Sequence, residues 1–112
     1  MTVQEMFVSV YVRDMQRAVT FYMNALGAAV DFASESWSCL VIAGIRVSLE
    51  LRDQAPSSTG LHFIVADVAR ACAAVAVSGG RIAPAVEGAG GVVIAQIVDS
   101  EGNAIILHQL TR

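Results

Sequence analysis

Charge and aromatic rings are scarce in this chain of 112 residues, of which 15% are charged and 6% are aromatic. Seven basic side chains stand against ten acidic ones, for a formal net charge of −3. Nucleic acids and anionic membranes bind clusters of Lys and Arg, so the composition argues against both as partners. The longest apolar run, "CLVIAGI", is far shorter than the roughly 20 residues that cross a bilayer, and no membrane span is predicted.

Cysteine is also rare, and the two that occur, Cys39 and Cys72, lack the close spacing of a metal site. In a reducing compartment such residues act as small buried hydrophobes. The opening stretch "MTVQEMFVSV" lacks the basic segment and the long apolar segment of a signal peptide. The sequence therefore predicts a cytoplasmic protein.

Apolar residues, by contrast, make up 55% of the chain. A chain of this length is expected to form a single domain, residues 1–112, with a core that needs neither a metal nor a disulfide. So many apolar residues leave little polar surface to cover the molecule. We therefore expect part of the surface to be buried against a second copy, in a homodimer.

An internal repeat organises the chain. The segment that begins "VSVYVRDMQRAV" aligns with the segment that begins "LHFIVADVARAC" at a constant offset of 53. In each copy an apolar β-type run leads to a helix-capping Asp, at Asp14 and at Asp67. Apolar residues at helical spacing follow, and glycine is expected to end the helix at Gly27 and at Gly79–Gly80. The repeat predicts two copies of one strand–helix unit.

Three strand-like runs follow each predicted helix. In the first half they are "AAVDFAS", "WSCLVIA" and "RVSLEL", and in the second half "RIAPAVE", "VVIAQIV" and "AIILHQ". The stretch "RDQAPSSTG" is rich in turn-forming residues, so module 1–52 and module 60–112 are expected to be joined by the linker 53–59. The glycine-rich segment 87–91 is predicted to be a loop that can act as a lid. The predicted fold class is α+β, with two tandem βαβββ modules.

Two segments carry a resemblance to a known superfamily. "YVRDMQRAVTFYMNALG" resembles the first strand and helix, and "DSEGNAIILHQ" the closing turn and strand, of the vicinal oxygen chelate superfamily. This superfamily contains glyoxalase I, extradiol dioxygenases, and fosfomycin- and bleomycin-resistance proteins. The resemblance implies that the modules curl into a half-open barrel around a cavity, which in small members often lies between modules of two chains. It leaves the activity open, because isomerases, dioxygenases, thiol transferases and non-catalytic drug binders share the scaffold.

The resemblance also implies where a metal would be held. Metal-dependent members carry one ligand on the first strand and one on the last strand of each module, which correspond here to Phe7, Glu50, Gly60 and Ile106. Of these four residues, Glu50 alone has a side chain that can bind a metal ion. No cofactor is therefore expected at the superfamily's metal positions.

Strand alternation brings further polar residues to the expected cavity, because side chains two residues apart on a strand share a face. By this rule His62 lies with Gly60, and His108 lies with Ile106. The first module offers aromatic walls and polar groups there by the same argument. The predicted ligand-binding residues are Phe7, Ser9, Tyr11, Trp37, Ser48, Glu50, His62, Ile106 and His108, with Phe32 as a further wall.

Three functions fit these residues. The first, which we favour, is non-catalytic binding of a small organic ligand that is aromatic or cationic, since Glu50 would attract a cation. The alternative is a metal-dependent glyoxalase-like lyase or isomerase, or a dioxygenase, in which Glu50, His62 and His108 hold a divalent metal and Glu50 is a catalytic base or ligand. The third is a structural dimer whose cavity is filled by its own side chains. The sequence does not decide whether the protein is an enzyme.

Overall fold

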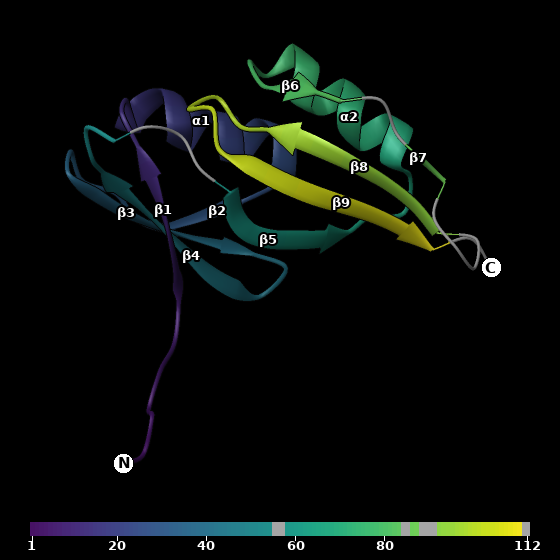
Figure 1. Cartoon of the computed structure of the whole chain (residues 1–112). Helices are drawn as coiled ribbons and strands as arrows, with labels where there is room; N and C mark the ends of the chain where they lie inside the picture. Colours follow the sequence, from purple (N-terminus) through teal and green to yellow (C-terminus); the bar gives the residue numbers. More distant parts are fainter. Residues whose placement is uncertain (55–57, 84–85, 88–91, 111–112) are drawn as a thin grey trace.

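The computed structural model describes residues 1–54, 58–83, 86–87 and 92–110. Within these residues the chain forms two βαβββ modules (Figure 1). The first module contains, in order, β1 (Val8–Val12), α1 (Met15–Leu26), β2 (Ala29–Phe32), β3 (Trp37–Ile42) and β4 (Ile45–Leu51). The second contains β5 (Ser58–Ile64), α2 (Val68–Val77), β6 (Arg81–Ile82), β7 (Val86–Glu87), β8 (Val92–Val98) and β9 (Ala104–Leu110). The predicted α+β fold with tandem βαβββ modules is confirmed.

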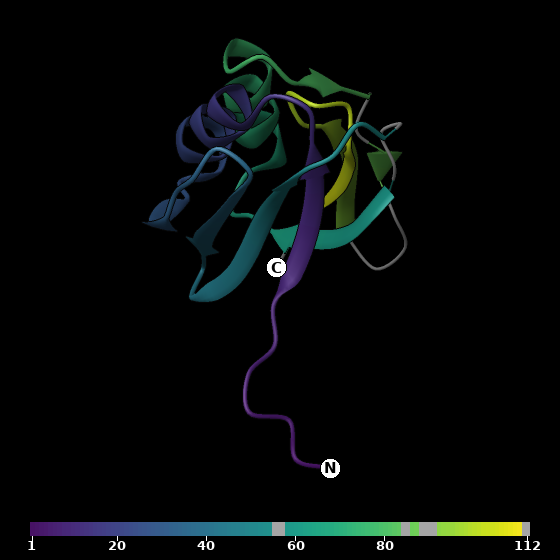
Figure 2. The same cartoon turned by 90° about the vertical axis from the view of Figure 1, so that its left-hand side faces the viewer.

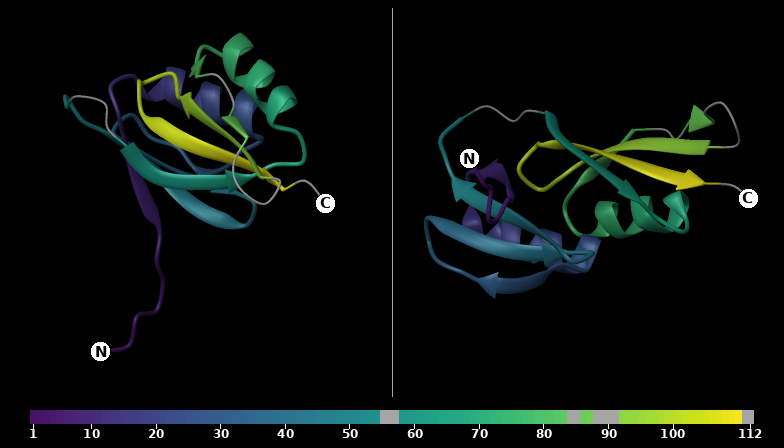
Figure 3. Two further views of the ribbon diagram at one scale, coloured as in Figure 1. Left: turned by 45° about the vertical axis from the view of Figure 1, so that its right-hand side comes forward. Right: turned by 90° about the horizontal axis from the view of Figure 1, so that it is seen from below.

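Each module builds one open sheet, and the two sheets follow the same design. The first has the strand order β1-β4-β3-β2, and the second has the order β5-β9-β8-β6 with β7 also paired to β8. The first strand of each module runs parallel to the last, as in β1 with β4 and β5 with β9. Figure 3 shows the modules side by side, each with its helix along its sheet.

The second module differs from the prediction in its boundaries. β5 begins at Ser58, inside the predicted linker 53–59, because its pairing with Ala104 of β9 overrides the turn-forming composition. The run "RIAPAVE", predicted as one strand, contributes two short strands, β6 and β7, and its proline has no N–H to donate to a ladder. Glu87, the first residue of the predicted lid, belongs to β7, and 88–91 lie outside the described residues.

The helices begin at the predicted caps. The Asp14 carboxylate accepts a hydrogen bond from the backbone N–H of Arg17 at 3.0 Å, and the Asp67 carboxylate accepts one from Arg70 at 3.1 Å. These bonds satisfy amides that the first turn of a helix leaves free. Helix α1 ends at Gly27, whose φ of 66° lies in the left-handed region that favours glycine.

The end of α2 departs from the predicted repeat. Its cap is Ser78, and Gly79 follows with a φ of 98°. Gly80 is needed for packing, because a Cβ there would lie 2.5 Å from the carbonyl oxygen of Val98. The equivalent glycines Gly27 and Gly80 therefore have different roles, one in the turn of the backbone and one in close packing.

Both helices lie on the same side of the molecule and pack against each other (Figure 2). Strand residues that face the helices are buried, and Val10, Val12 and Leu49 are at most 2% exposed. Tyr11, between two of these residues on β1, points the other way and is 42% exposed. The two sheets thus share a core with the helices and present their second faces away from it.

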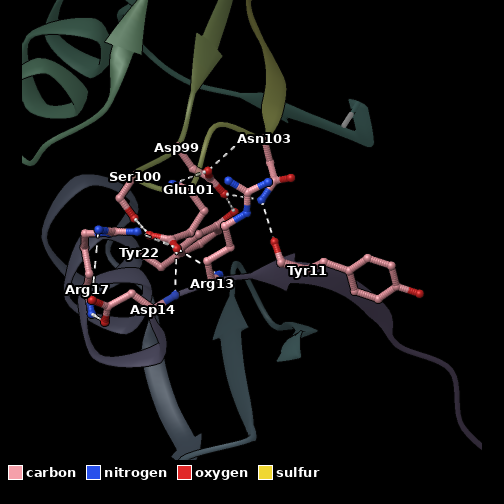
Figure 4. Close-up of polar contacts among 9 residues, drawn as sticks. All are labelled: Tyr11, Arg13, Asp14, Arg17, Tyr22, Asp99, Ser100, Glu101 and Asn103. Atoms are coloured by element: carbon pink, nitrogen blue, oxygen red, sulfur yellow. Dashed lines mark hydrogen bonds and ion pairs between the residues drawn. The ribbon is translucent and has the colours of Figure 1, made fainter. Parts of the chain in front are cut away.

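The turn between β8 and β9 connects the second module to the first (Figure 4). Glu101 on this turn accepts hydrogen bonds from the backbone N–H groups of Arg13 and Asp14 at 3.0 and 2.9 Å. It accepts two more from the Arg17 guanidinium at 2.7 and 3.0 Å. Burial by itself would raise the pKa of Glu101, but the hydrogen bonds from Arg17, the Asp14 amide, Ser100 and the Arg13 amide outweigh it and lower the pKa to about 2.

Two further side chains of this turn are buried against the first module. Asp99 accepts a hydrogen bond from the Tyr22 hydroxyl at 2.7 Å, and the Asn103 side-chain amide donates to the Tyr11 carbonyl oxygen at 2.8 Å. Burial, together with the charge and hydrogen bond of Asp99, raises the pKa of Tyr22 well above its usual value. The superfamily resemblance implied a turn here, whereas its role as a buried connection between the modules was not predicted.

Candidate functional site

The first sheet carries a cluster of aromatic rings on the face that points away from the helices. Trp37 on β3 is central, with its ring centroid 6.3 Å from that of Phe7 and 5.5 Å from that of Phe32. Tyr11 on β1 lies in register with Glu50 on β4, which in turn lies in register with Trp37. We call Phe7, Tyr11, Phe32 and Trp37 the aromatic face.

The aromatic face is unusually open. Phe7 is 52% exposed, Phe32 is 50% exposed and Tyr11 is 42% exposed. Aromatic side chains contribute most when they are buried, so a cluster left open on a folded chain marks a surface for a ligand or a partner. The ring of Trp37 meets those of Phe7 and Phe32 at 67° and 41°, so the three rings make edge-on and tilted contacts with one another.

Polar groups lie among these rings. The hydroxyl oxygens of Ser9 and Ser48 are hydrogen-bonded at 2.5 Å, across the β1–β4 pair. Glu50 accepts two hydrogen bonds from the Arg52 guanidinium, at 2.6 and 3.1 Å, which raise the pKa of Arg52. The guanidinium also lies over the Tyr11 ring, 5.5 Å from its centroid. Glu50 is therefore half of an ion pair, and the cation that it attracts in this structure is Arg52 of the same chain.

The second sheet brings the two histidines together. His62 Nδ1 on β5 is 2.7 Å from His108 Nε2 on β9, and the ring centroids are 5.0 Å apart. Both side chains point away from the helices because their strand neighbours, such as Phe63 and Leu107, pack into the core. The strand register places Ile106 beside His62 and Ile64 beside His108, so the histidines meet diagonally across the β5–β9 pair. We call His62 and His108 the histidine pair.

The structure does not unite all three residues of the alternative metal set. His62 and His108 meet on the second sheet, whereas Glu50 lies on the first and binds Arg52. In the part of the chain that the structure describes, no three His, Cys, Asp or Glu side chains come together as a metal site.

The positions that the superfamily resemblance implies for a metal do not fit one either. Phe7, Gly60 and Ile106 offer no donor atom, and the carboxylate of the fourth, Glu50, is already paired. These side chains therefore do not fit the superfamily's metal.

Sequence reasoning overlooked Arg52, although alternation from Glu50 would have placed it on the same face. A hollow of about 650 Å³ next to the start of α1, lined among others by Gln16, Thr20 and Glu35, contains none of the predicted site residues. It lies on the helix side of the first module and carries no constellation of catalytic groups, so the two open sheet faces remain the candidate site.

The geometry agrees with what comparison with known proteins finds. The family model of the Glyoxalase/Bleomycin resistance protein/Dioxygenase superfamily matches residues 6–107. The chain belongs to this superfamily. The match spans both modules, from the start of the aromatic face to the last strand, and it confirms the resemblance carried by the first helix and the closing turn.

Several solved structures share the fold at low sequence identity. The fosfomycin resistance protein FosX from Listeria monocytogenes superimposes with a TM-score of 0.81 and 17% identity, covering 99% of this chain and 96% of its own. TioX from Micromonospora sp. ML1 gives 0.75 and 16%, covering 97% and 100%. The bleomycin resistance determinant encoded on transposon Tn5 gives 0.71 and 18%, covering 98% and 100%.

At these identities the likeness establishes the fold alone. No curated protein matches the chain. Among the described residues, no helix is long and apolar enough to span a membrane.

Proposed function

We propose that this protein binds a small, partly aromatic organic molecule on its aromatic face, without a metal at the superfamily's usual ligand positions. The observation that carries the proposal is the open cluster of rings around Trp37, with Phe7 and Phe32 in contact with it. Such surfaces bind planar molecules by stacking, while a few polar groups fix the orientation. The hydroxyls of Ser9 and Ser48 and the Glu50–Arg52 pair are the polar groups available.

The names of two similar structures support a small organic molecule as the ligand. One is a fosfomycin resistance protein and another is a bleomycin resistance determinant, both named for small molecules. For the present chain, the Glu50–Arg52 pair changes the expected charge preference. A cationic ligand must compete with Arg52 for Glu50, whereas a ligand that carries both charges can bind the pair from two sides.

We propose further that the protein acts as a homodimer in the cytoplasm. Large apolar side chains are open on both sheet faces, including Phe7 and Phe32 on the first and Ile64, 72% exposed, on the second. Contact with a second copy would remove this surface from water and turn each open face into the wall of an enclosed cavity.

Fluorescence of Trp37 tests ligand binding directly, because it is the one tryptophan in the sequence and lies at the centre of the aromatic face. We would titrate the protein with bleomycin, fosfomycin, and simple aromatic amines and acids, and confirm each response by calorimetry. Phe32→Ala removes one stacking ring, which is worth about 0.5–1.5 kcal/mol, so affinity should fall by about twofold to twelvefold.

The matched control is Val77→Ala, which removes an apolar side chain that is 86% exposed on α2. It should leave binding unchanged. A panel in which no compound alters Trp37 emission, or an equal loss of affinity in both variants, would contradict the proposal.

A second candidate function is a metal-dependent lyase, isomerase or dioxygenase, and the contact between His62 and His108 is the observation in its favour. It would require Glu50 to leave Arg52 and reach the histidines on the other sheet. Native mass spectrometry of protein purified without chelator separates the two functions. A dimer that retains an organic adduct and no metal supports the binder. A dimer that retains a divalent metal in each chain supports the enzyme only if Glu50→Gln lowers the metal content, because the enzyme uses Glu50 as a ligand together with the histidines.

A further inference from the structure

The histidine pair has a geometry that neither the fold nor the proposed ligand-binding surface requires. His62 and His108 come from different strands, are the two histidines of the sequence, and place Nδ1 of one 2.7 Å from Nε2 of the other. A hydrogen bond of this kind uses the proton of one ring and the lone pair of the other. It therefore brings two potential metal donors to one point on an open surface.

The distance between these two nitrogens is close to the distance between two nitrogen ligands of one metal ion. Zinc binds imidazole nitrogen at about 2.0–2.1 Å in tetrahedral geometry, which separates two donor nitrogens by about 3.3 Å. The observed 2.7 Å must open by about 0.6 Å, which small rotations of two surface rings can supply.

We propose that the histidine pair is a binding site for a divalent transition metal ion of the zinc, nickel and copper class, held by two imidazoles with water completing its coordination. Imidazole is a favoured ligand of these ions. The proton now shared between the rings moves, through solvent, to the far nitrogen of its own ring. Each histidine then gives one lone pair to the metal and keeps one N–H, so binding to the neutral pair requires no net proton release.

The fold prepares the pair for this role. The strands β5 and β9 are hydrogen-bonded in parallel, and their inward residues are packed in the core, so the two Cα positions are held. The residues in register beside the histidines are apolar, with Ile106 beside His62, and Ile64 and Ile94 beside His108. A metal there meets a defined pair of donors, and because the pair is exposed, water can complete its coordination.

This site differs from both metal arrangements considered above. It uses none of the positions that the superfamily resemblance implies, and it does not require Glu50, which lies on the other sheet and binds Arg52. It is also independent of the proposed function, since a metal can bind the second sheet whether or not an organic molecule binds the aromatic face.

Titration of tag-free protein with zinc chloride, in a buffer that does not bind metals, tests the proposal. The sequence contains two histidines, so proton NMR should show two sets of imidazole signals. Both sets should shift together and saturate at about one zinc ion per chain. Loss of even an indirect partner of a metal ligand costs about 10–100-fold in affinity, so His62→Ala and His108→Ala should each weaken binding by at least about tenfold.

Two matched variants make the result decisive. Gln96→Ala alters an exposed residue of β8 in register with Ile106 and should retain full zinc affinity. Glu50→Gln should also retain it, because the carboxylate is not a ligand. Circular dichroism verifies that each variant is folded. The proposal is overturned if one histidine alone responds, if the shifts do not saturate, or if Glu50→Gln weakens zinc binding as much as His62→Ala.

Discussion

Replacement of Glu101 by Gln is the most direct test of how the modules are held together. Glu101 is 7% exposed and accepts hydrogen bonds from two backbone N–H groups of the first module and from the Arg17 guanidinium. Gln preserves the shape and one acceptor oxygen but removes the negative charge. The variant should therefore keep its fold and lose stability, because the cation of Arg17 and the first turn of α1 face a neutral group.

The pKa of Glu101 sets the size of this loss. A carboxyl whose pKa falls from 4.5 in the unfolded chain to about 2 in the folded one stabilises the fold by about 3 kcal/mol, at about 1.36 kcal/mol per pKa unit. Since the folded pKa is the lower one, this contribution is complete above pH 4.5 and disappears as the pH falls through about 2. The difference between wild type and Glu101→Gln should therefore be largest at neutral pH and shrink between pH 5 and pH 2.

Urea unfolding at pH 7, 4 and 3, followed by circular dichroism at one protein concentration, measures this difference. A fixed concentration is needed because association would add to the apparent stability. Glu35→Gln is the matched control, since Glu35 is an exposed glutamate in the β2–β3 loop. A Glu101→Gln variant within about 0.5 kcal/mol of wild type at pH 7, the scatter of ordinary surface changes, would refute the reasoning. So would a loss that is the same at pH 7 and pH 3.

Three other substitutions examine separate parts of the structure. Tyr22→Phe removes a buried hydrogen bond to Asp99 and should cost about 1–3 kcal/mol, lowering the midpoint of thermal unfolding; an unchanged midpoint would mean that the bond contributes nothing. Gly80→Ala should lower the free energy of urea unfolding by about 1–3 kcal/mol, because the new Cβ would lie 2.5 Å from the Val98 carbonyl oxygen. A variant as stable as wild type would show that the surrounding atoms move aside without cost. Arg52→Gln frees Glu50 and should strengthen the binding of cationic aromatic ligands over anionic ones in Trp37 fluorescence titrations. Equal changes for both ligand classes would show that Glu50 does not face the ligand.

The local features of the fold followed from spacing along the chain. Asp14 and Asp67 cap their helices as the repeat predicted, and Gly27 ends α1. Alternation along β5 correctly placed His62 opposite the core. The prediction failed where pairing with a neighbour changed the outcome, as at Ser58, which joins β5 because β9 lies beside it.

The same limit applies to the candidate site, because patterns along one strand do not contain the pairing between strands. Alternation identifies the face of a strand, so Tyr11, Trp37, Glu50 and the histidines could each be assigned a face. It does not say which side chains on different strands touch. The contact of His62 with His108 depends on the β5–β9 register, and the separation of Glu50 from both histidines depends on how the modules lie.

The sequence by itself determined the tandem modules, the helix ends, the core faces and the absence of donors at three of the four implied metal positions. Each of these depends on residues close together in the chain, where helical and strand periodicity apply. Only the tertiary structure decided that Glu101 binds α1 across 84 residues of chain, and that the histidines meet. These contacts depend on strand register and module packing, which arise from the summed burial of many side chains and leave no short pattern to find.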